Sequence, residues 1–288
     1  MEYRVLGRTG LRVSAVGFGG APAGLRNYLG QWEPADPQAS EQIEHAIDRA
    51  VTLGINYFDT APGYGGGLSE TMFGRALKKH RERVVLATKL KATNAAETRR
   101  SVELSLERLQ TDHLDLIQYH GGWYSDADVE NILKPDGVLD GLRTLRAEGL
   151  VRSIGFTTEG VNGAVSQLIA TDEFDTVMVC YNLIFQHPYD PSRHAGLMYE
   201  AEARHMGIVV MRPLTSGTFQ KWLSWLDPGI ENRVDLPKAL LSFVLSNPLV
   251  DVAIVGMRTA GEVEANVANA DDRQARIDLD ELHTRYVG

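Results

Sequence analysis

Four titratable side chains stand at or just after the ends of apolar runs in the first half of the chain. Asp59 ends the run INYFD, and Tyr64 follows it in the glycine-rich stretch APGYGGG. Lys89 ends the run VVLATK, and His120 ends LDLIQYH. Taken singly, each has an ordinary explanation: a helix cap, a surface ring, a strand end in solvent or a loop histidine. Three consecutive strands that each deliver a titratable group at the same end, however, indicate a shared site.

These four groups suit proton transfer to or from a carbonyl oxygen. A phenol with a pKa of about 10 is a weak acid at neutral pH unless a cation such as Lys89 stabilises the phenolate. Asp59 can hold that lysine charged, and His120 can donate to the carbonyl oxygen. None of the four supplies electrons, so a reduction requires a nicotinamide cofactor. An aldolase or isomerase that uses Lys89 as a Schiff base is an alternative that needs no nicotinamide.

Apolar, β-rich runs alternate with segments of helical periodicity along the chain. The helical spacing is clear in Ser40–Leu53, Thr98–Leu109, Asp140–Glu148 and Pro237–Leu245. The eight runs that we expect to form strands are Val13–Phe18, Ile55–Asp59, Val84–Lys89, Leu114–His120, Ile154–Thr157, Val177–Tyr181, Ile208–Arg212 and Val252–Val255. Near-continuous apolar runs are typical of parallel strands buried on both faces. Eight strand–helix units predict a closed (β/α)8 TIM barrel, whose active sites lie at the C-terminal ends of the strands.

The main alternative architecture is a doubly wound sheet, but no glycine-rich dinucleotide fingerprint follows the first strand. Tyr3–Leu6 and Leu11–Ser14 flank Gly7–Gly10, which predicts an N-terminal β-hairpin that caps one end of the barrel. The residues after Asp271 predict a short charged helix. Because the sequence contains no low-complexity linker, we expect a single barrel domain over 1–288.

The composition narrows the class of protein and its partners. Of the 288 residues, 43% are apolar and the net charge is −9, which disfavours nucleic acid or anionic membranes as partners. No run approaches the ~20 apolar residues of a membrane helix, and the first residues contain no apolar signal core, so we expect a cytoplasmic protein. The single cysteine, Cys180, excludes an intrachain disulfide and a cysteine-rich metal site. We therefore expect no bound metal.

The motifs around these residues resemble those of the aldo-keto reductases. The opening YRVLGRTGLRVSAVGFGGAP is similar to the family's N-terminal hairpin and first strand, and GINYFDTAPGYG to its most specific signature. SVELSLERLQTDHLDLIQYH resembles a second signature and VDVAIVGMRTAGEVEANV a third, so the likeness covers nearly all of the chain. The resemblance implies a barrel enzyme that reduces aldehydes and ketones with NAD(P)(H). It also implies a catalytic tetrad of Asp59, Tyr64, Lys89 and His120, with Tyr64 as the general acid.

By the same resemblance, the dinucleotide lies along the rim formed by the later strands. The cofactor contacts that it implies are Gly20, Ala21, Asp59, Thr157, Thr158, Met178, Met211, Arg212, Pro213, Leu214, Ser216, Gly217, Gly256, Arg258, Glu262 and Asn266. Thr157 and Thr158 stand where many members have Ser-Asn, Met178 where they have Gln, and Met211 where an aromatic ring often stacks on the nicotinamide. The GFTT and VMRPL patterns resemble a bacterial-type branch, some of whose members carry an iron–sulfur module that a single cysteine excludes here.

The choice between NADP(H) and NAD(H) depends on two residues of opposite charge. Arg258 follows a buried run in a glycine-bounded turn and suits a phosphate, which favours NADP(H). Glu262 stands where some members have a basic residue for the 2′-phosphate, and a carboxylate there would repel it. We expect NADP(H), with NAD(H) left open.

Aromatic side chains in loops on the expected active face predict the walls of a substrate pocket. They are Tyr28, Trp32, Trp123, Tyr124, Trp222 and Trp225. Such walls suit an apolar, aromatic or sugar-like carbonyl compound, although several of these rings could simply fix loops to the barrel. Two other functions stay open: a cofactor-sensing regulatory barrel with little turnover, and an NAD-dependent sugar or alcohol dehydrogenase. The sequence leaves the substrate, the direction of reaction and the oligomeric state open.

Overall fold

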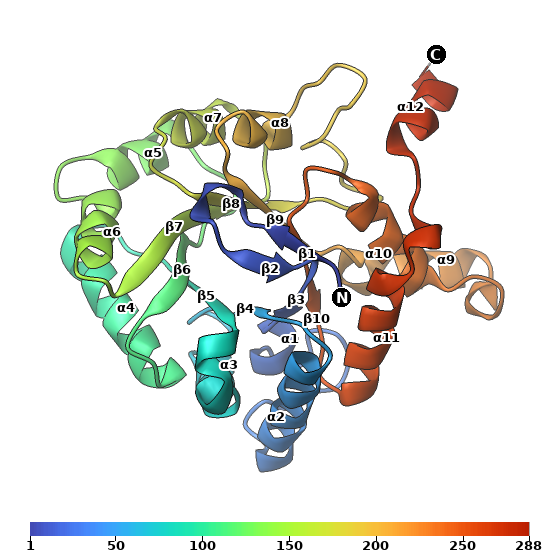
Figure 1. The fold of residues 1–288 in the computed structure, drawn as a ribbon, viewed down its shortest axis with the longest axis horizontal. Helices are drawn as coiled ribbons and strands as arrows, with labels where there is room; N and C mark the ends of the chain where they lie inside the picture. The colour runs from blue at the N-terminus through green and yellow to red at the C-terminus, as the bar shows by residue number, and fades with distance from the viewer. Residues whose placement is uncertain (288) are drawn as a thin grey trace.

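Parallel strands close into a barrel in the computed structural model, which describes residues 1–287 (Figure 1). Within these residues eight strands form the ring, in the order β10-β3-β4-β5-β6-β7-β8-β9. They are β3 (Val16–Gly19), β4 (Tyr57–Asp59), β5 (Val85–Leu90), β6 (Leu114–Tyr119), β7 (Val151–Thr158), β8 (Thr176–Cys180), β9 (Gly207–Met211) and β10 (Val252–Gly256). The predicted TIM barrel is therefore confirmed. Gly288, the last residue of the predicted domain, lies outside the described residues.

Helices surround the barrel and follow its strands in the chain (Figure 1). They are α1 (Ala21–Gly24), α2 (Pro37–Thr52), α3 (Leu68–Leu77), α4 (Ala95–Leu109), α5 (Asp126–Leu133), α6 (Val138–Ala147), α7 (Gly163–Ala170), α8 (Leu197–Glu202), α9 (Thr218–Leu226), α10 (Leu236–Ser246), α11 (Ala260–Asp271) and α12 (Leu279–Val287). The helix expected after Asp271 is α12, which a short 3₁₀ turn at Arg273–Ala275 precedes.

Side-chain caps explain where several of these helices begin. The Asp36 carboxylate accepts a hydrogen bond from the backbone N–H of Gln38, and Pro37 occupies the first turn of α2, where its missing N–H costs nothing. The buried face of α2 then includes Ile43 and Ile47. The sequence-based start at Ser40 was too late, because the cap and the proline precede the first apolar residue of that face.

The N-terminal hairpin closes one end of the barrel, as predicted. It consists of β1 (Tyr3–Val5) and β2 (Arg12–Ser14), which pair antiparallel and lie across the barrel mouth that faces the viewer in Figure 1. Leu6 and Val13 are fully buried and pack with the residues that fill the barrel interior. A Cβ on Gly7 would lie only 2.1 Å from the backbone nitrogen of Gly207, so glycine is needed where the hairpin meets β9.

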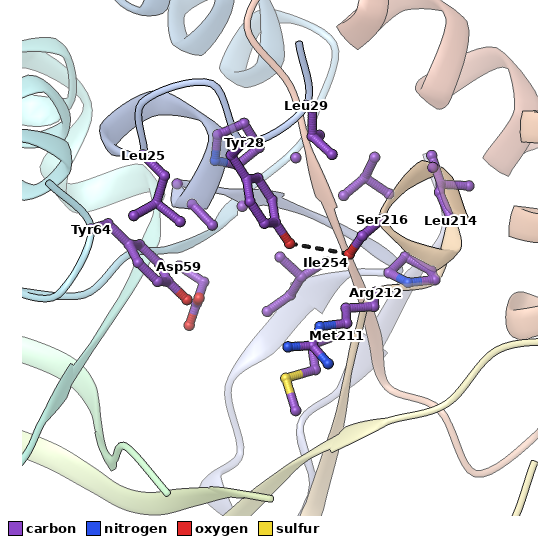
Figure 2. A pocket seen from close by; sticks show the side chains of 18 of the residues that line it. Leu25, Tyr28, Leu29, Asp59, Tyr64, Met211, Arg212, Leu214, Ser216 and Ile254 are labelled. Atoms are coloured by element: carbon purple, nitrogen blue, oxygen red, sulfur yellow. Dashed lines mark hydrogen bonds between the residues drawn. The ribbon is translucent and has the colours of Figure 1, made fainter. Parts of the chain in front are cut away.

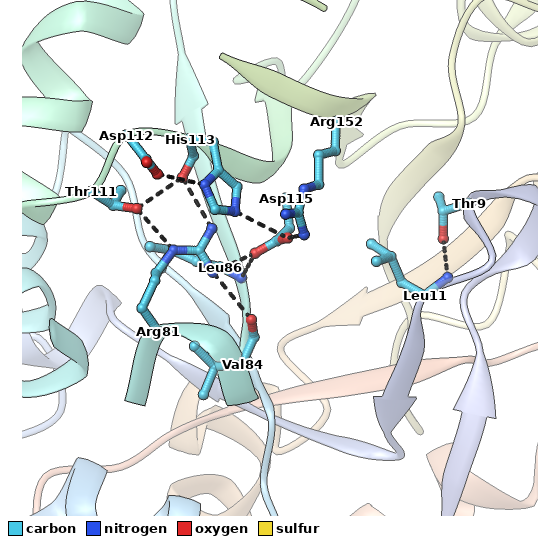
Figure 3. Close-up of polar contacts among 10 residues, drawn as sticks. All are labelled: Thr9, Leu11, Arg81, Val84, Leu86, Thr111, Asp112, His113, Asp115 and Arg152. Atoms are coloured by element: carbon cyan, nitrogen blue, oxygen red, sulfur yellow. Dashed lines mark hydrogen bonds and ion pairs between the residues drawn. The ribbon is translucent and has the colours of Figure 1, made fainter. Parts of the chain in front are cut away.

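Carboxylates at this N-terminal end bind the backbone of neighbouring strands (Figure 3). Asp115 on β6 accepts a hydrogen bond from the Leu86 N–H on β5, at 2.9 Å. Its two oxygens also pair with Arg81 and Arg152, each at 2.8 Å. The buried charge is thereby compensated, and the register of two strands is tied to their side chains.

The same arrangement recurs around the barrel. Asp175, just before β8, accepts from the Ile154 N–H on β7 at 2.8 Å, and Asp251, just before β10, accepts from the Ile208 N–H on β9 at 2.9 Å. In each case the carboxylate accepts from a backbone N–H of the preceding strand. This end of the barrel therefore serves stability, and the opposite end is left for the site.

Candidate active site

A cleft of about 570 Å³ opens at the C-terminal ends of the strands. Asp59, Tyr64, Lys89 and His120 all line it, so the structure brings together the side chains that the sequence analysis singled out. Figure 2 shows Tyr64 and Asp59 on one side of this cleft and Met211 and Arg212 on another. The volume falls within the usual range for a small-molecule or cofactor site.

Lys89 is the centre of a buried polar cluster. Its Nζ donates to Asp59 Oδ1, to the Thr60 carbonyl at 3.0 Å and to the Tyr64 hydroxyl at 3.3 Å. The side chain is only 1% exposed, and the Asp59 carboxylate is also buried. The other Asp59 oxygen accepts from Gln118 Nε2 at 3.0 Å, a contact that the sequence analysis missed. Each charge in the cluster is paired, as buried charges must be.

Burial opposes charge on each of these groups, and the neighbouring charges modify its effect. Burial disfavours the Lys89 ammonium, yet Asp59 and Tyr64 outweigh it and raise the pKa of Lys89. Burial also raises the pKa of Asp59, although Lys89 opposes this. For Tyr64, burial outweighs the attraction of Lys89 for the phenolate, and the pKa lies above its ordinary value. Contrary to the expectation that Lys89 makes Tyr64 more acidic, the resting phenol is a firmly protonated donor.

His120 completes the group as a neutral ring. Its imidazole meets the Tyr64 ring edge-on, with centroids 6.0 Å apart. Burial, together with the positive charges of Lys89 and Lys91, lowers the pKa of His120 to about 4. At neutral pH the imidazole is uncharged and carries one N–H, so it can donate a hydrogen bond without releasing a proton.

Glycines fix the loop that carries Tyr64. A Cβ on Gly24 would come within 2.3 Å of the Tyr64 carbonyl oxygen, and one on Gly65 within 2.2 Å of the Gly24 carbonyl oxygen. Gly65 also has a positive φ of 72°. The stretch GYGGG therefore supplies close packing against α1, which holds the phenol over Lys89. Beneath it, the Ser69 hydroxyl donates to the Gly20 carbonyl at 2.9 Å.

Most of the residues expected to contact a dinucleotide lie along the same cleft. Those that line it are Gly20, Ala21, Asp59, Thr157, Met178, Met211, Arg212, Pro213, Leu214, Ser216, Gly217, Gly256, Glu262 and Asn266. Thr158 and Arg258 are outside this lining. Polar lining residues that the sequence analysis missed include Glu159, Gln220, Lys221 and Asn269. They follow strands or lie on helices without a motif, so only the fold brings them to the cleft.

Two of the expected contacts have hydroxyls that are already engaged. Thr157 Oγ1 donates to the Gly121 carbonyl at 2.6 Å. Thr158 is buried, and its hydroxyl lies 2.8 Å from the Gly160 carbonyl and 3.1 Å from the Gly122 carbonyl. These hydroxyl protons therefore fix the loop after β6 to the end of β7.

Arg258 lies beside the cleft with part of its guanidinium unsatisfied. The group stacks 4.5 Å from the Trp32 ring centroid, and Nε donates to the Pro22 carbonyl at 2.9 Å. Among the described residues, its buried Nη2 has no hydrogen-bond partner. Glu262 forms a capping box with Thr259 at the start of α11 and also accepts from the Arg258 N–H. The unsatisfied nitrogen suits an anion such as a phosphate oxygen.

The aromatic side chains expected to form a substrate pocket are largely elsewhere. Tyr28 lines the cleft, and its hydroxyl bonds to Ser216 Oγ at 3.1 Å across it (Figure 2). Trp32 lies outside the lining, under Arg258. Tyr124 is buried and donates to the Thr157 carbonyl at 3.0 Å.

Three tryptophans expected in the pocket project into solvent. Trp123 and Trp222 are 73% and 56% exposed, and Trp225 on the same helix is 81% exposed. Trp32, Trp123, Tyr124, Trp222 and Trp225 are outside the cleft lining, and contact of any of them with a substrate stays a prediction.

Within residues 1–287 no cluster of His, Cys, Asp and Glu side chains could hold a metal ion. No helix in that range is both long and apolar enough to span a bilayer.

Comparisons with known proteins identify the family and the fold. The sequence model of the aldo/keto reductase family matches residues 16–224. The chain is 30% identical to L-galactose dehydrogenase of Arabidopsis thaliana, over 93% of this chain and 88% of that protein. The structure superposes on the holo form of an aldo-keto reductase from Bacillus halodurans with a TM-score of 0.79 and 23% identity, covering 100% of this chain and 96% of the other. It also superposes on an aldo-keto reductase from Klebsiella pneumoniae in complex with NADPH, with a TM-score of 0.76 and 23% identity, covering 99% of this chain and 94% of the other.

Proposed function

The chain belongs to the aldo/keto reductase family of oxidoreductases, and on this premise we propose that it transfers hydride between NADP(H) and a small carbonyl compound, or in the reverse direction from the alcohol. Tyr64 is the proton donor or acceptor. The observation that carries the proposal is the Tyr64 hydroxyl, 3.3 Å from a buried Lys89 ammonium that Asp59 holds in the cleft. The narrower placement in a bacterial-type branch and the single domain over 1–288 stay predictions.

Each of the four side chains has one role in this proposal. Tyr64 protonates the carbonyl oxygen, since its high pKa keeps the phenol protonated until negative charge develops on that oxygen. Lys89 stabilises the phenolate that this leaves, and Asp59 keeps Lys89 charged and in place. Neutral His120 donates a second hydrogen bond to the carbonyl oxygen. When bound, the reduced nicotinamide supplies the hydride.

The residues along the cleft fit a phosphorylated dinucleotide. Arg258 Nη2 is buried and has no hydrogen-bond partner within the part of the chain that the structure describes, so it suits the 2′-phosphate of NADP(H). Glu262 opposes this assignment, because its carboxylate lines the same cleft and keeps its negative charge although backbone N–H groups hold it at the start of α11. The Klebsiella pneumoniae structure in complex with NADPH supports the same assignment. NAD(H) remains the alternative.

The substrate class is a small aldehyde, ketone or sugar-like carbonyl compound. The relative named L-galactose dehydrogenase supports including sugars and the oxidative direction. A panel of carbonyl compounds with NADPH and NADH, and of alcohols and aldoses including L-galactose with the oxidised cofactors, identifies the class by absorbance change of the nicotinamide.

Tyr64→Phe tests the function directly. This variant keeps the ring and removes the acidic hydroxyl, so reduction of a reactive aldehyde such as 4-nitrobenzaldehyde is expected to fall at least about 100-fold. NADPH binding, measured by fluorescence, is expected to stay close to wild type. Tyr119→Phe, a matched loss of a phenol from the end of β6, serves as the control. Unchanged turnover in Tyr64→Phe would remove the tyrosine from the mechanism.

A further inference from the structure

An ion pair in the cleft has no part in the proton transfer described above. Arg212 Nη2 donates to Glu159 Oε1 at 2.7 Å, and both residues line the cleft. Their side chains are 39% and 36% exposed, so solvent or a ligand can reach them. Glu159 follows β7 and Arg212 follows β9, so the pair spans the end of β8. In the ring of strands, β8 is diametrically opposite β4, which carries Asp59.

The backbone of Arg212 is held in a conformation that most side chains avoid. Its φ is +56°, in the left-handed region. Fully buried Asn182 secures this conformation, since its Nδ2 donates to the Arg212 carbonyl at 3.0 Å. The Asn182 oxygen accepts from two further backbone N–H groups, at Ile184 and Phe185. Strain of this kind, supported by a buried side chain, is typical of functional positions.

Threonine and methionine side chains at this end of the cleft offer no free hydrogen-bond donor to a carboxamide. The primary carboxamide of a nicotinamide presents a carbonyl acceptor and an NH₂ donor side by side. The hydroxyl protons of Thr157 and Thr158 are engaged with backbone carbonyls. Met178 and Met211, which line the cleft beside the ion pair, have no N–H or O–H in their side chains. The Arg212–Glu159 pair, in contrast, offers guanidinium donors next to a carboxylate acceptor.

We propose that Arg212 donates to the carboxamide oxygen of the nicotinamide and that Glu159 accepts from its NH₂ group while orienting the guanidinium. The inference rests on the proposed function, because it assumes that a nicotinamide binds between Tyr64 and β8. A guanidinium has five donors, so Arg212 can keep Glu159 and still bind the carboxamide. The pair thus fixes the rotation of the ring and the face that it presents to the substrate.

Cofactor analogues altered only at the carboxamide test the proposal without using activity. Dissociation constants are measured by fluorescence for NADP⁺ and for two analogues. In the thio analogue, sulfur replaces the carboxamide oxygen. In the acetylpyridine analogue, 3-acetylpyridine adenine dinucleotide phosphate, a methyl group replaces the carboxamide NH₂. Wild type is expected to bind NADP⁺ about 10-fold more tightly than either analogue, as charge-assisted hydrogen bonds are lost. In Arg212→Met the preference over the thio analogue is expected to vanish.

Variants of the acceptor separate contact from general disruption. Glu159→Ala is expected to lose the preference for NADP⁺ over the acetylpyridine analogue, and Glu159→Gln, which keeps an acceptor oxygen, to retain part of it. Arg212→Lys keeps the charge without the planar fork and is expected to recover little. Glu173→Ala breaks an ion pair of the same length, 2.7 Å to Arg143, on the outer surface and is the matched control. It is expected to bind all three cofactors as wild type does.

The outcomes distinguish this inference from the proposed function. If wild type binds none of the three cofactors, the proposed NADP(H) dependence itself fails. If wild type binds NADP⁺ and Arg212→Met weakens NADP⁺ and the thio analogue by the same factor, Arg212 does not contact the carboxamide. If neither Arg212→Met nor Glu159→Ala changes any constant, the ion pair has no role in cofactor binding. Circular dichroism of each variant confirms that the barrel is folded.

Discussion

Lys89 places an ammonium where water hardly reaches it, and its stability there depends on Asp59. Removing one partner of a buried ion pair leaves the other charge uncompensated, which typically costs about 3–5 kcal/mol. Besides Lys89, which donates to one oxygen of the Asp59 carboxylate, Gln118 donates to the other. The pair therefore has a structural role that must be separated from its chemical one.

Lys89→Met is expected to destabilise the protein by about 3 kcal/mol and to reduce turnover by at least about 100-fold. Both effects follow from the lost cation, the first through buried Asp59 and the second through the phenolate of Tyr64. Urea unfolding and steady-state reduction of an aldehyde measure them. In the double variant Asp59→Asn/Lys89→Met, stability is expected to recover while turnover does not. Recovery of turnover in the double variant would show that Lys89 acts only through stability.

His120 is expected to stay neutral throughout the physiological range. Its pKa of about 4 lies below that of an ordinary imidazole because burial and nearby lysines disfavour the charge. The imidazole NMR signal of His120 is the one that disappears in His120→Gln. In the native protein its chemical shift should stay constant between pH 8 and 5.5, whereas histidines of the urea-unfolded chain titrate near 6.5. A native midpoint near 6.5 would contradict the assigned environment. Between pH 6.5 and 4 only the unfolded state binds a proton on His120. Protonation of this residue therefore lowers the stability of the native protein as the pH falls through that window.

The catalytic candidates could be predicted at the residue scale because strand ends in a barrel converge whatever the loops do. Asp59, Lys89 and His120 needed only the apolar runs before them, and all line the cleft. The sign of the pKa change at Tyr64 could not be predicted, since it depends on the depth of burial. The directions of Trp123 and Trp222 could not be predicted either, since both were expected in loops facing the pocket, whereas Trp222 lies on α9 and both rings are largely exposed.

At the scale of elements, the carboxylates at the starts of strands tie neighbouring strands together. Asp115 is compensated by Arg81 and Arg152, whereas burial raises the pKa of Asp251 to about 6, although Arg4 and backbone N–H groups oppose this. The folded pKa thus exceeds the unfolded value of 3.8, so the native state binds the extra proton between pH 3.8 and 6. Stability falls as the pH rises through that window, and the destabilisation caused by ionised Asp251 reaches its full size above pH 6.

Asp251→Asn is expected to stabilise the barrel at pH 7.5 by on the order of 1–2 kcal/mol. The amide keeps an oxygen for the Ile208 N–H and removes the poorly solvated charge. Urea unfolding at pH 7.5 and pH 4 measures the effect, which should nearly vanish at pH 4. The matched change Asp115→Asn is expected to destabilise, because it removes the partner of two arginines. Equal destabilisation by both substitutions would show that Asp251 is compensated as well as Asp115.

The number and type of the barrel strands followed from the sequence pattern, but their boundaries did not. The run Val13–Phe18 was expected as one strand, yet it divides into the end of β2 and the start of β3. The division has a physical cause: the Ala15 N–H bonds to the Glu2 carbonyl on the hairpin side, and the Ser14 hydroxyl donates to the Val16 carbonyl. Such pairings are tertiary, so a local apolar pattern does not contain them.

At the scale of the whole molecule, the cleft draws its lining from most of the barrel strands and from α11. A ligand that fills it therefore contacts segments far apart in the chain, including Gly20, Met211 and Asn266. Unfolding any of these segments destroys the site, so binding energy is coupled to the stability of the barrel.

This coupling makes NADPH a stabiliser of the fold. At 100 times its dissociation constant it should add about 2.7 kcal/mol to the free energy of unfolding, a rise in Tm of roughly 5 °C for a chain of this size. NADH at the same concentration should raise Tm less, because it lacks the phosphate that suits Arg258 Nη2, a nitrogen without a hydrogen-bond partner within residues 1–287. Differential scanning fluorimetry measures both shifts. Arg258→Ala should bring the two shifts together, while Arg143→Ala, on the outer surface, should leave them apart. Equal Tm shifts in the wild-type protein would show that NADH binds as tightly as NADPH and that Arg258 does not bind the 2′-phosphate.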